Sequence, residues 1–349
     1  MTSVRDDVRA ALPAWLAARV LVAVARLGAT VLLHGRAEPE PFQQGLYAWD
    51  GSYYRAIAAG GYGAVDPGGT RFHPLLPLLG QGGIGVLLLA NVGALVAAAL
   101  VHRLVLVQFD DRDLAGRSAT LVGLAPPAFV LVWAYAEGPF LAVTAGFLLA
   151  LRARRWWWVA ALGLAAALLR PTGLYLAVPV AVVLWQERSS LRKPGALAAL
   201  VAPAVGMGSF LLWVGHRFGD VWLPLRVQDE LRGGTVVAPL RLVQGIGEVA
   251  TDPFGDGLHV PFAFAIVALT WVAVRRLPAA WSALAVVTAL LALSAGNLNS
   301  VERYAFGCIP LLVALAMLTA GRWWRPALIA SATTFTAMAT MAWYGSYVP

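Results

Sequence analysis

The stretch IGVLLLANVGALVAAALVHRLVLV, residues 84–107, decides the fold class, because it is a long apolar run with one arginine and no acidic residue. A helix needs about 20 predominantly apolar residues to cross the roughly 30 Å hydrocarbon core of a bilayer. The rest of the chain has the same character. Of its 349 residues, 60% are hydrophobic and 13% are charged, whereas about a quarter of a soluble domain is charged. The sequence therefore predicts an integral membrane protein.

Similar apolar runs recur along the chain and predict about ten or eleven membrane-spanning helices. The first is expected to be a retained helix and not a cleaved signal peptide, because it is long and contains Arg19 and Arg26. No segment has the composition of a soluble domain, so residues 1–349 are predicted to form one all-α polytopic membrane domain. The predicted spans are 13–33, 84–107, 114–134, 138–151, 156–169, 171–186, 196–216, 258–274, 279–295, 305–320 and 326–344.

The arginines predict how these spans are oriented. They gather in alternate connections, and the other short connections carry little charge beyond Arg170 and Arg303. The positive-inside rule then places the N-terminus in the cytoplasm of a multi-pass plasma-membrane protein. The two long connections, 34–83 and 217–257, both fall on the extracytoplasmic side. Because they hold most of the non-helical polar residues, we expect any chemistry on that face.

The sharpest local pattern is WDGSYYRAIAAGGY, residues 49–62, in the first long connection. It predicts a short helix with Asp50 as its N-cap and a glycine pair at its end. Trp49, Tyr53 and Ile57 form an apolar stripe that suits the membrane interface. Asp50 has two interpretations: a helix cap, which is the commoner use of such an acid, or a general base at the membrane surface. One carboxylate suffices when the leaving group is a stable anion such as a lipid phosphate, whereas a glycoside hydrolase normally needs a second acid.

The order of motifs along most of the chain resembles the bacterial branch of the PIG-V-type (GPI mannosyltransferase 2-like) family, which are GT-C integral membrane mannosyltransferases. The resemblance begins with the 49–62 pattern and the Phe-x-Pro-Leu-x-Pro box at 72–77. It continues with Tyr135-Ala136-Glu137, Arg170-Pro171-Thr172-Gly173, Gly219-Asp220, Gln228 and Arg303-Tyr304 ahead of Pro310.

This resemblance implies a GT-C-like helix bundle and an inverting glycosyltransferase. Such an enzyme moves a sugar, typically mannose, from a polyprenyl-phosphate donor to a hydroxyl of a lipid, glycan or protein acceptor. The family's first-loop acid maps onto Asp50, which implies that Asp50 is the catalytic base. The sequence has no glycine-rich nucleotide loop and no Cys/His metal cluster, so no cofactor is expected beyond the lipid-linked sugar phosphate. No metal is expected either, although participation of a divalent ion stays open. Nucleic acid is not an expected partner, because the arginines lie between apolar spans.

Three basic residues are candidates for binding the donor phosphate. Arg170 interrupts an apolar stretch, and an arginine at membrane depth usually faces a cavity or a partner; the alternative is a plain hairpin whose arginine reaches the headgroups. Arg303 follows Glu302 and could instead pair with it. His73 lies in the proline box, where a structural role is the alternative. A guanidinium fits phosphate bidentately and keeps its charge, so Arg170 and Arg303 are expected to stabilise the departing phosphate.

Further residues are expected to contact the sugar or the acceptor. Glu137 opens a predicted helix, where a first-turn acid favoured by the helix dipole is the alternative. Asp220 could equally end a turn, and the segment 222–232 could form an interfacial helix that anchors the chain or recognises the acceptor. The candidate substrate-binding residues are Trp49, Tyr53, Tyr54, Glu137, Asp220, Gln228 and Tyr304.

Functions from two other classes stay open. A polytopic transporter or lipid flippase would use Arg170 and Glu137 to line a pathway, although the paired repeats typical of transporters are not evident in the sequence. The chain could also be a non-catalytic subunit of a glycosylation complex.

Overall fold

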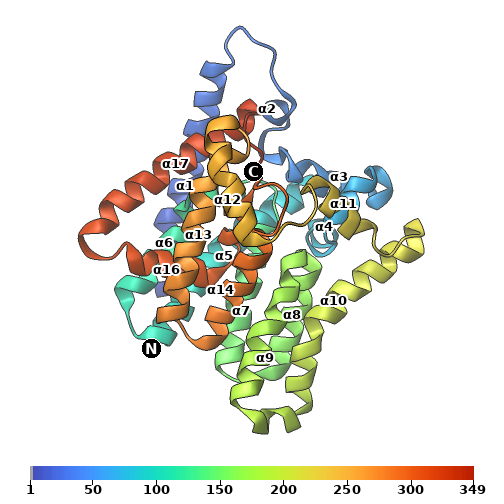
Figure 1. Ribbon diagram of the computed structural model, residues 1–349, viewed down its shortest axis with the longest axis vertical. Coiled ribbons are helices and arrows are strands. Elements are labelled where there is room, and N and C mark those ends of the chain that lie inside the picture. The colour runs from blue at the N-terminus through green and yellow to red at the C-terminus, as the bar shows by residue number, and fades with distance from the viewer. Residues whose placement is uncertain (1–2) are drawn as a thin grey trace.

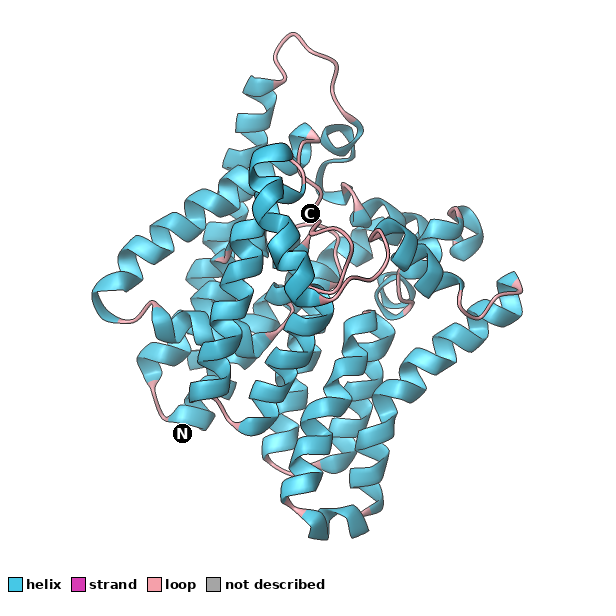
Figure 2. Ribbon diagram, viewed as in Figure 1, coloured by secondary structure: helices cyan, strands magenta, loops and turns pink. Residues whose placement is uncertain are grey.

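The computed structural model describes residues 3–349, and helices are the regular elements throughout that range (Figure 2). The only strand-like pairing among these residues is an isolated bridge between Thr235 and Ala295. The prediction of an all-α protein is therefore confirmed.

Within residues 3–349, four helices are long and apolar enough to cross a membrane: α1 (Val4–Leu32), α5 (Gly83–Phe109), α10 (Pro194–Phe218) and α13 (Asp256–Arg276). Large apolar side chains lie on their outer faces; Ile84, for example, is 74% exposed. Extended apolar surface of this kind mostly occurs where lipid or another protein covers it. These four helices fit a membrane protein, while the full number of crossings and their orientation stay predictions.

Two of the predicted spans are not single helices, because a proline follows an interruption in each. Proline has no backbone N–H and its ring clashes with the preceding turn, but it is well tolerated in the first turn of a new helix. The pairs of elements are α6 (Arg112–Leu124) with η4 (Pro126–Leu131), and α15 (Val301–Phe306) with α16 (Ile309–Leu318).

The remaining predicted spans are shorter helices that pack around the long ones. They are α7 (Glu137–Arg152), α8 (Trp156–Leu169), η5 (Pro171–Leu176) leading into α9 (Ala177–Gln186), α14 (Ala279–Ala292), and α17 (Trp324–Tyr344) after η7 (Gly321–Trp323). α8 lies along α10, α7 along α5, and α17 along α1. Fully buried aromatic rings join these layers; Trp133 packs against Trp343 of α17 with ring centroids 5.1 Å apart.

The two long connections are themselves largely helical. Residues 34–83 contain α2 (Glu40–Gln44), η1 (Gly45–Tyr47), α3 (Asp50–Gly60), η2 (Tyr62–Ala64), η3 (Pro67–Arg71) and α4 (Leu75–Gly80), and residues 217–257 contain α11 (Leu223–Leu231) and α12 (Ala238–Thr251). Both connections gather at one end of the molecule, at the top of Figure 1, and α11 packs against η3. The N-terminal mark lies at the other end. This arrangement brings the polar residues of the two connections together.

Candidate active site

The start of α3 is fixed by an unusual backbone conformation at Trp49. Its φ of 56° lies in the left-handed region, which is costly for a bulky residue and persists only where surrounding contacts hold it. Those contacts are present. The Trp49 backbone N–H donates to Gln44 Oε1 (3.2 Å), its indole Nε1–H donates to the Ala342 carbonyl of α17 (3.0 Å), and its carbonyl accepts from Ser52 Oγ (2.7 Å).

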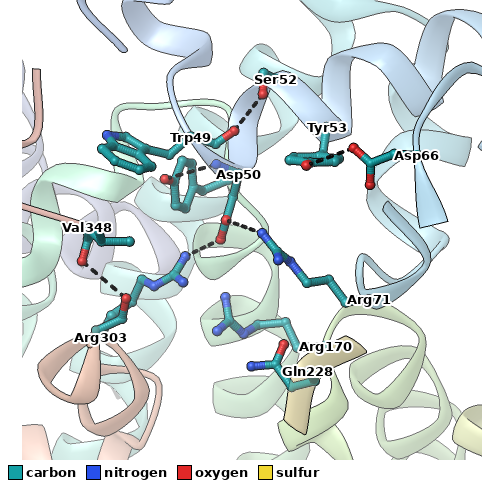
Figure 3. Close-up of polar contacts among 12 residues, drawn as sticks. Trp49, Asp50, Ser52, Tyr53, Asp66, Arg71, Arg170, Gln228, Arg303 and Val348 are labelled. Carbon is teal, nitrogen blue, oxygen red and sulfur yellow. Dashed lines mark hydrogen bonds and ion pairs between the residues drawn. The ribbon is translucent and has the colours of Figure 1, made fainter. Parts of the chain in front are cut away.

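The prediction that Asp50 caps this helix is wrong. Trp49 is the N-cap, Asp50 is the first helical residue, and no side chain caps α3. The Asp50 carboxylate is drawn instead toward two arginines: Arg303 Nη1 donates to its Oδ2, and Arg71 Nη2 lies 3.9 Å from its Oδ1 (Figure 3). The Asp50 backbone N–H donates to the Tyr135 hydroxyl at 3.3 Å. The carboxylate is therefore free of the helix backbone and faces a group of basic side chains.

The charge state of Asp50 follows from these neighbours. Burial acts to raise the pKa of the Asp50 carboxyl, but the charges of Arg303 and Arg71 outweigh it and hold the pKa below its usual value. Asp50 is consequently a carboxylate at neutral pH, able to accept a proton.

A second acid, Glu137, holds two of the arginines. It is the first residue of α7, is 1% exposed, forms an ion pair with Arg170, and has its Oε1 3.4 Å from Arg303 Nη1. Arg303 thus bridges Asp50 and Glu137. Because Glu137 is enclosed by these partners, the structure does not place it where it could contact a sugar.

Two of the alternative interpretations of the arginines are also wrong. Arg170 does not reach outward to headgroups but turns inward to Glu137, with its side chain 12% exposed. Arg303 does not pair with Glu302, which contacts His259 instead, at 3.0 Å between Nδ1 and Oε2. Both arginines therefore belong to the interior of the site.

These groups share a cavity of about 450 Å³ between α3, η3, η5, α11, α14 and α15. The Gln228 amide donates to the Tyr304 hydroxyl at 3.3 Å, and the Arg232 guanidinium lies 4.4 Å from the Tyr304 ring centroid. Six sequence-predicted residues line the cavity: Asp50, Tyr54, Arg170, Gln228, Arg303 and Tyr304.

Sequence reasoning missed several lining residues, including Arg71, Arg232, Asn297 and Asn299. Arg71 directly precedes the proline box, and Arg232 ends the segment that was predicted to be interfacial. Nothing in the sequence brings these two together, because they meet only through the packing of η3 against α11. The one signal in the sequence that could have identified these two residues was the position of a basic residue at the border of each motif.

The structure does not bring His73 to the cavity surface, which argues against a phosphate-side role. His73 is 1% exposed, its Nδ1 lies 2.5 Å from the Ala167 carbonyl oxygen, and its ring packs on Phe210. Burial lowers the pKa of His73 to about 4, so the ring is neutral near pH 7 and offers no charge to a phosphate.

We predict that His73→Phe leaves the KM for the donor within about twofold of wild type but lowers stability by about 1 kcal/mol, because a buried hydrogen bond is lost. Donor titrations and thermal unfolding of the purified variant measure the two effects. A KM raised tenfold or more would return His73 to the binding site.

Three other candidates also lie outside the cavity lining. The Trp49 indole is committed to α17, and the Tyr53 hydroxyl donates to Asp66 Oδ2 at 3.2 Å while its ring stacks on Phe72. Asp220 bonds to Arg226 and accepts from a backbone N–H in its own turn. Trp49 and Tyr53 shape the loop that carries Asp50, and Asp220 shapes the approach to α11.

A second, mostly apolar cavity of about 640 Å³ borders the C-terminal half of α3 and lies between α3, α4, α8 and α10. Its walls include Ile57, Tyr62, Pro77, Phe210 and Trp213. Tyr54 lines the polar cavity and Ile57, one turn further along α3, lines the apolar one. One short helix thus borders a charged cavity near its first turns and an apolar cavity further along.

Among residues 3–349 no three His, Cys, Asp or Glu side chains gather where they could hold a metal ion. The expectation that the protein works without a metal or cofactor stays a prediction.

Comparison with known protein families finds no family model that matches this chain, and no curated protein matches it either.

Proposed function

We propose that the protein is an inverting glycosyltransferase that moves a sugar, with mannose as the expected one, from a polyprenyl-phosphate donor to a hydroxyl of a lipid, glycan or protein acceptor. The observation that carries the proposal is the polar cavity, in which one ionised carboxylate, Asp50, lies among arginines beside an apolar compartment. Base, phosphate site and tail site are the parts that such a reaction needs.

The chemistry at the cavity would run as a single displacement. The acceptor oxygen attacks the anomeric carbon, the bond from that carbon to the phosphate oxygen breaks, and its electron pair leaves with the lipid phosphate. The acceptor proton passes to Asp50. A carboxylate with a lowered pKa is a weak base, which suits a transition state with oxocarbenium character in which the bond to the leaving group breaks early and the proton leaves late.

The arginines are unequal in their capacity to bind the leaving phosphate. Arg303 is held between Asp50 and Glu137, and Arg170 is held by Glu137. Among the described residues, Arg232 has no carboxylate within ion-pair distance, and the ion-pair partner of Arg71 is Asp50, at 3.9 Å. Among the side chains, four arginines against two acids leave two arginines without an acidic partner of their own, so Arg71 and Arg232 are the pair best placed to stabilise charge growing on the phosphate.

The apolar cavity supports a donor with a long hydrocarbon tail. An isoprenoid chain lying against Ile57, Phe210 and Trp213 would leave its phosphate at the α3 end that carries Asp50. Such a site would bind the lipid part of the donor by burial of apolar surface. The gathering of residues 34–83 and 217–257 at one end supports a cavity open to one side of the membrane, and we place that side outside the cytoplasm, in the plasma membrane, because of the arginine pattern.

The proposal is tested by incubating the purified protein with defined polyprenyl-phosphate sugars and a panel of lipid and glycan acceptors, followed by mass spectrometry of the products. A glycosylated acceptor together with free polyprenyl phosphate is expected. Movement of the lipid across liposome membranes with no covalent product would instead assign the protein to the flippases, since a cavity with two arginines that lack an acidic partner of their own could also bind a lipid phosphate that is only transported.

We predict that Arg232→Gln raises the KM for the donor by about 10- to 100-fold with a smaller change in kcat, because a charge-assisted contact to phosphate contributes about 1.5–3 kcal/mol. Arg226→Gln is the matched control: Arg226 is exposed, pairs with Asp220 and does not line the cavity. Equal effects of the two substitutions on KM would contradict the assignment of Arg232.

A further inference from the structure

A third pocket, of about 550 Å³, lies between the starts of α8 and α10. The turns that lead into these helices are at the lower end of Figure 1, opposite α3 and α11. Its walls are formed by residues 154–158 and 193–195, which include two arginines, one lysine and three tryptophans. It shares no residue with the polar cavity or the apolar cavity.

This pocket has more basic side chains than acidic partners. Arg154 is used internally: its Nε donates to Glu187 Oε2 at 2.8 Å and its Nη1 donates to the Leu151 carbonyl at 2.6 Å. Within residues 3–349, Arg155 and Lys193 form no ion pair with any carboxylate. Three cationic side chains against one carboxylate leave two positive charges at the pocket.

The helices α8 and α10 both begin at this pocket with a basic N-cap residue. Arg155 is the N-cap of α8 and Lys193 is the N-cap of α10; neither helix has a side-chain cap or an acidic residue in its first turn. Unpaired N–H groups and the helix dipole make a helix N-terminus positive, so a cation there is unfavourable and an anion is favourable. Two such starts, each with a cationic N-cap, form a site that a bound anion would stabilise.

The tryptophans indicate what kind of anion fits. Trp157 and Trp158 are 66% and 63% exposed, as expected of indoles at the headgroup level of a bilayer. Position 195 is glycine, and a Cβ there would come within 3.2 Å of the Trp157 ring, so the absence of a side chain lets this indole lie against the start of α10. The pocket therefore combines a phosphate-binding part with amphipathic walls.

We propose that this pocket binds the headgroup of an anionic phospholipid, with the phosphate between Arg155, Lys193 and the starts of α8 and α10. The indoles of Trp157 and Trp158 flank the glycerol and the upper acyl chains. The inference needs only that the chain lies in a bilayer, and it is independent of the proposed glycosyltransferase activity. Clusters of basic residues beside membrane-spanning helices commonly recognise anionic headgroups in this way.

The test is lipid binding to the full chain in neutral detergent, measured by native mass spectrometry with phosphatidylglycerol and with phosphatidylcholine of the same acyl chains. Wild type is expected to bind phosphatidylglycerol about tenfold more tightly or better. Arg155→Gln/Lys193→Gln should reduce that affinity to the phosphatidylcholine level. The matched control, Arg275→Gln/Arg276→Gln, removes two charges from the C-terminal turn of α13 and should leave the preference intact.

Three outcomes would overturn the proposal. One is a double variant at 155 and 193 that keeps the wild-type preference, provided that its unfolding midpoint in phosphatidylcholine is unchanged. Another is an equal loss in the control at 275 and 276, which would mean that surface charge in general attracts the lipid. The third is thermal protection of the protein by inorganic phosphate alone that equals its protection by phosphatidylglycerol. That result would assign the pocket to a free anion and not to a lipid.

Discussion

Asp50→Asn is expected to lower kcat for sugar transfer by about 10²–10⁴-fold, the range in which a general base usually contributes. The amide keeps the shape of the side chain but cannot take up the acceptor proton. The KM for the donor should change much less, because Arg71 and Arg232 remain in place. The measurement is steady-state transfer by the purified protein with a defined polyprenyl-phosphate sugar.

Asp66→Asn provides the matched control for this substitution. Asp66 lies in the same connection, accepts a hydrogen bond from Tyr53 and caps η3, but it does not line the cavity. Its replacement should leave kcat within a few-fold of wild type. Undiminished turnover by Asp50→Asn would remove this residue from the role of base and leave the cavity as a binding site.

Removal of Arg303 is expected to have the largest effect on stability. Arg303 is buried and holds both Asp50 and Glu137, and deleting one partner of a buried ion pair typically costs about 3–5 kcal/mol, because the remaining charge is left uncompensated. Arg303→Gln should therefore lower the unfolding midpoint strongly, as measured in mild detergent. Arg322→Gln, an exposed guanidinium at η7, should change the midpoint little.

The double variant Asp50→Asn/Arg303→Gln separates this interaction from a simple loss of packing. Because it removes the charge that Arg303 neutralises, its destabilisation should be clearly smaller than the sum of the two single effects. Additive effects within about 0.5 kcal/mol would contradict a direct coupling between the two side chains.

The pH dependence of transfer provides an independent measure of the same contact. Arg303 and Arg71 lower the pKa of Asp50 below the usual aspartate pKa of about 3.9. In wild type the carboxylate therefore stays ionised at neutral pH, and the base is lost only as the pH falls through this lowered pKa. In Arg303→Gln one of the charges that lower the Asp50 pKa is gone, while burial still raises this pKa. The acidic limb of the kcat/KM profile should therefore move to higher pH. An unmoved limb would mean that another group controls it.

The helices could largely be predicted from sequence, because apolar composition and length dominate their placement. The run 84–107 lies within α5, and the 49–62 pattern became α3. Pro126 and Pro310 could be seen in the sequence. Whether each proline would divide its predicted span into two elements depended on how the neighbouring helices packed. The left-handed backbone at Trp49 could not be predicted, since a tryptophan adopts it only when contacts from α17 hold the indole.

The candidate site could be predicted in part. Asp50 was identified from the 49–62 pattern and the family resemblance, and Arg170 because a charge in an apolar stretch is costly unless it has a partner. The structure places both on one cavity, together with Arg303. The pairing between them depends on contacts across 253 positions of sequence, as between Asp50 and Arg303. Arg71 and Arg232 were missed because both lie in polar segments, where an arginine needs no explanation.

The tether from Trp49 to α17 also bears on how the protein is made. The indole that fixes the start of α3 donates to Ala342, 293 positions later in the chain, and Asp50 receives its arginine from α15. A nascent chain that has emerged only as far as α14 has neither contact. Alignment of the carboxylate therefore follows synthesis of α15 and α17, and a copy in the membrane that lacks these helices would not yet have the arrangement on which the proposed reaction depends.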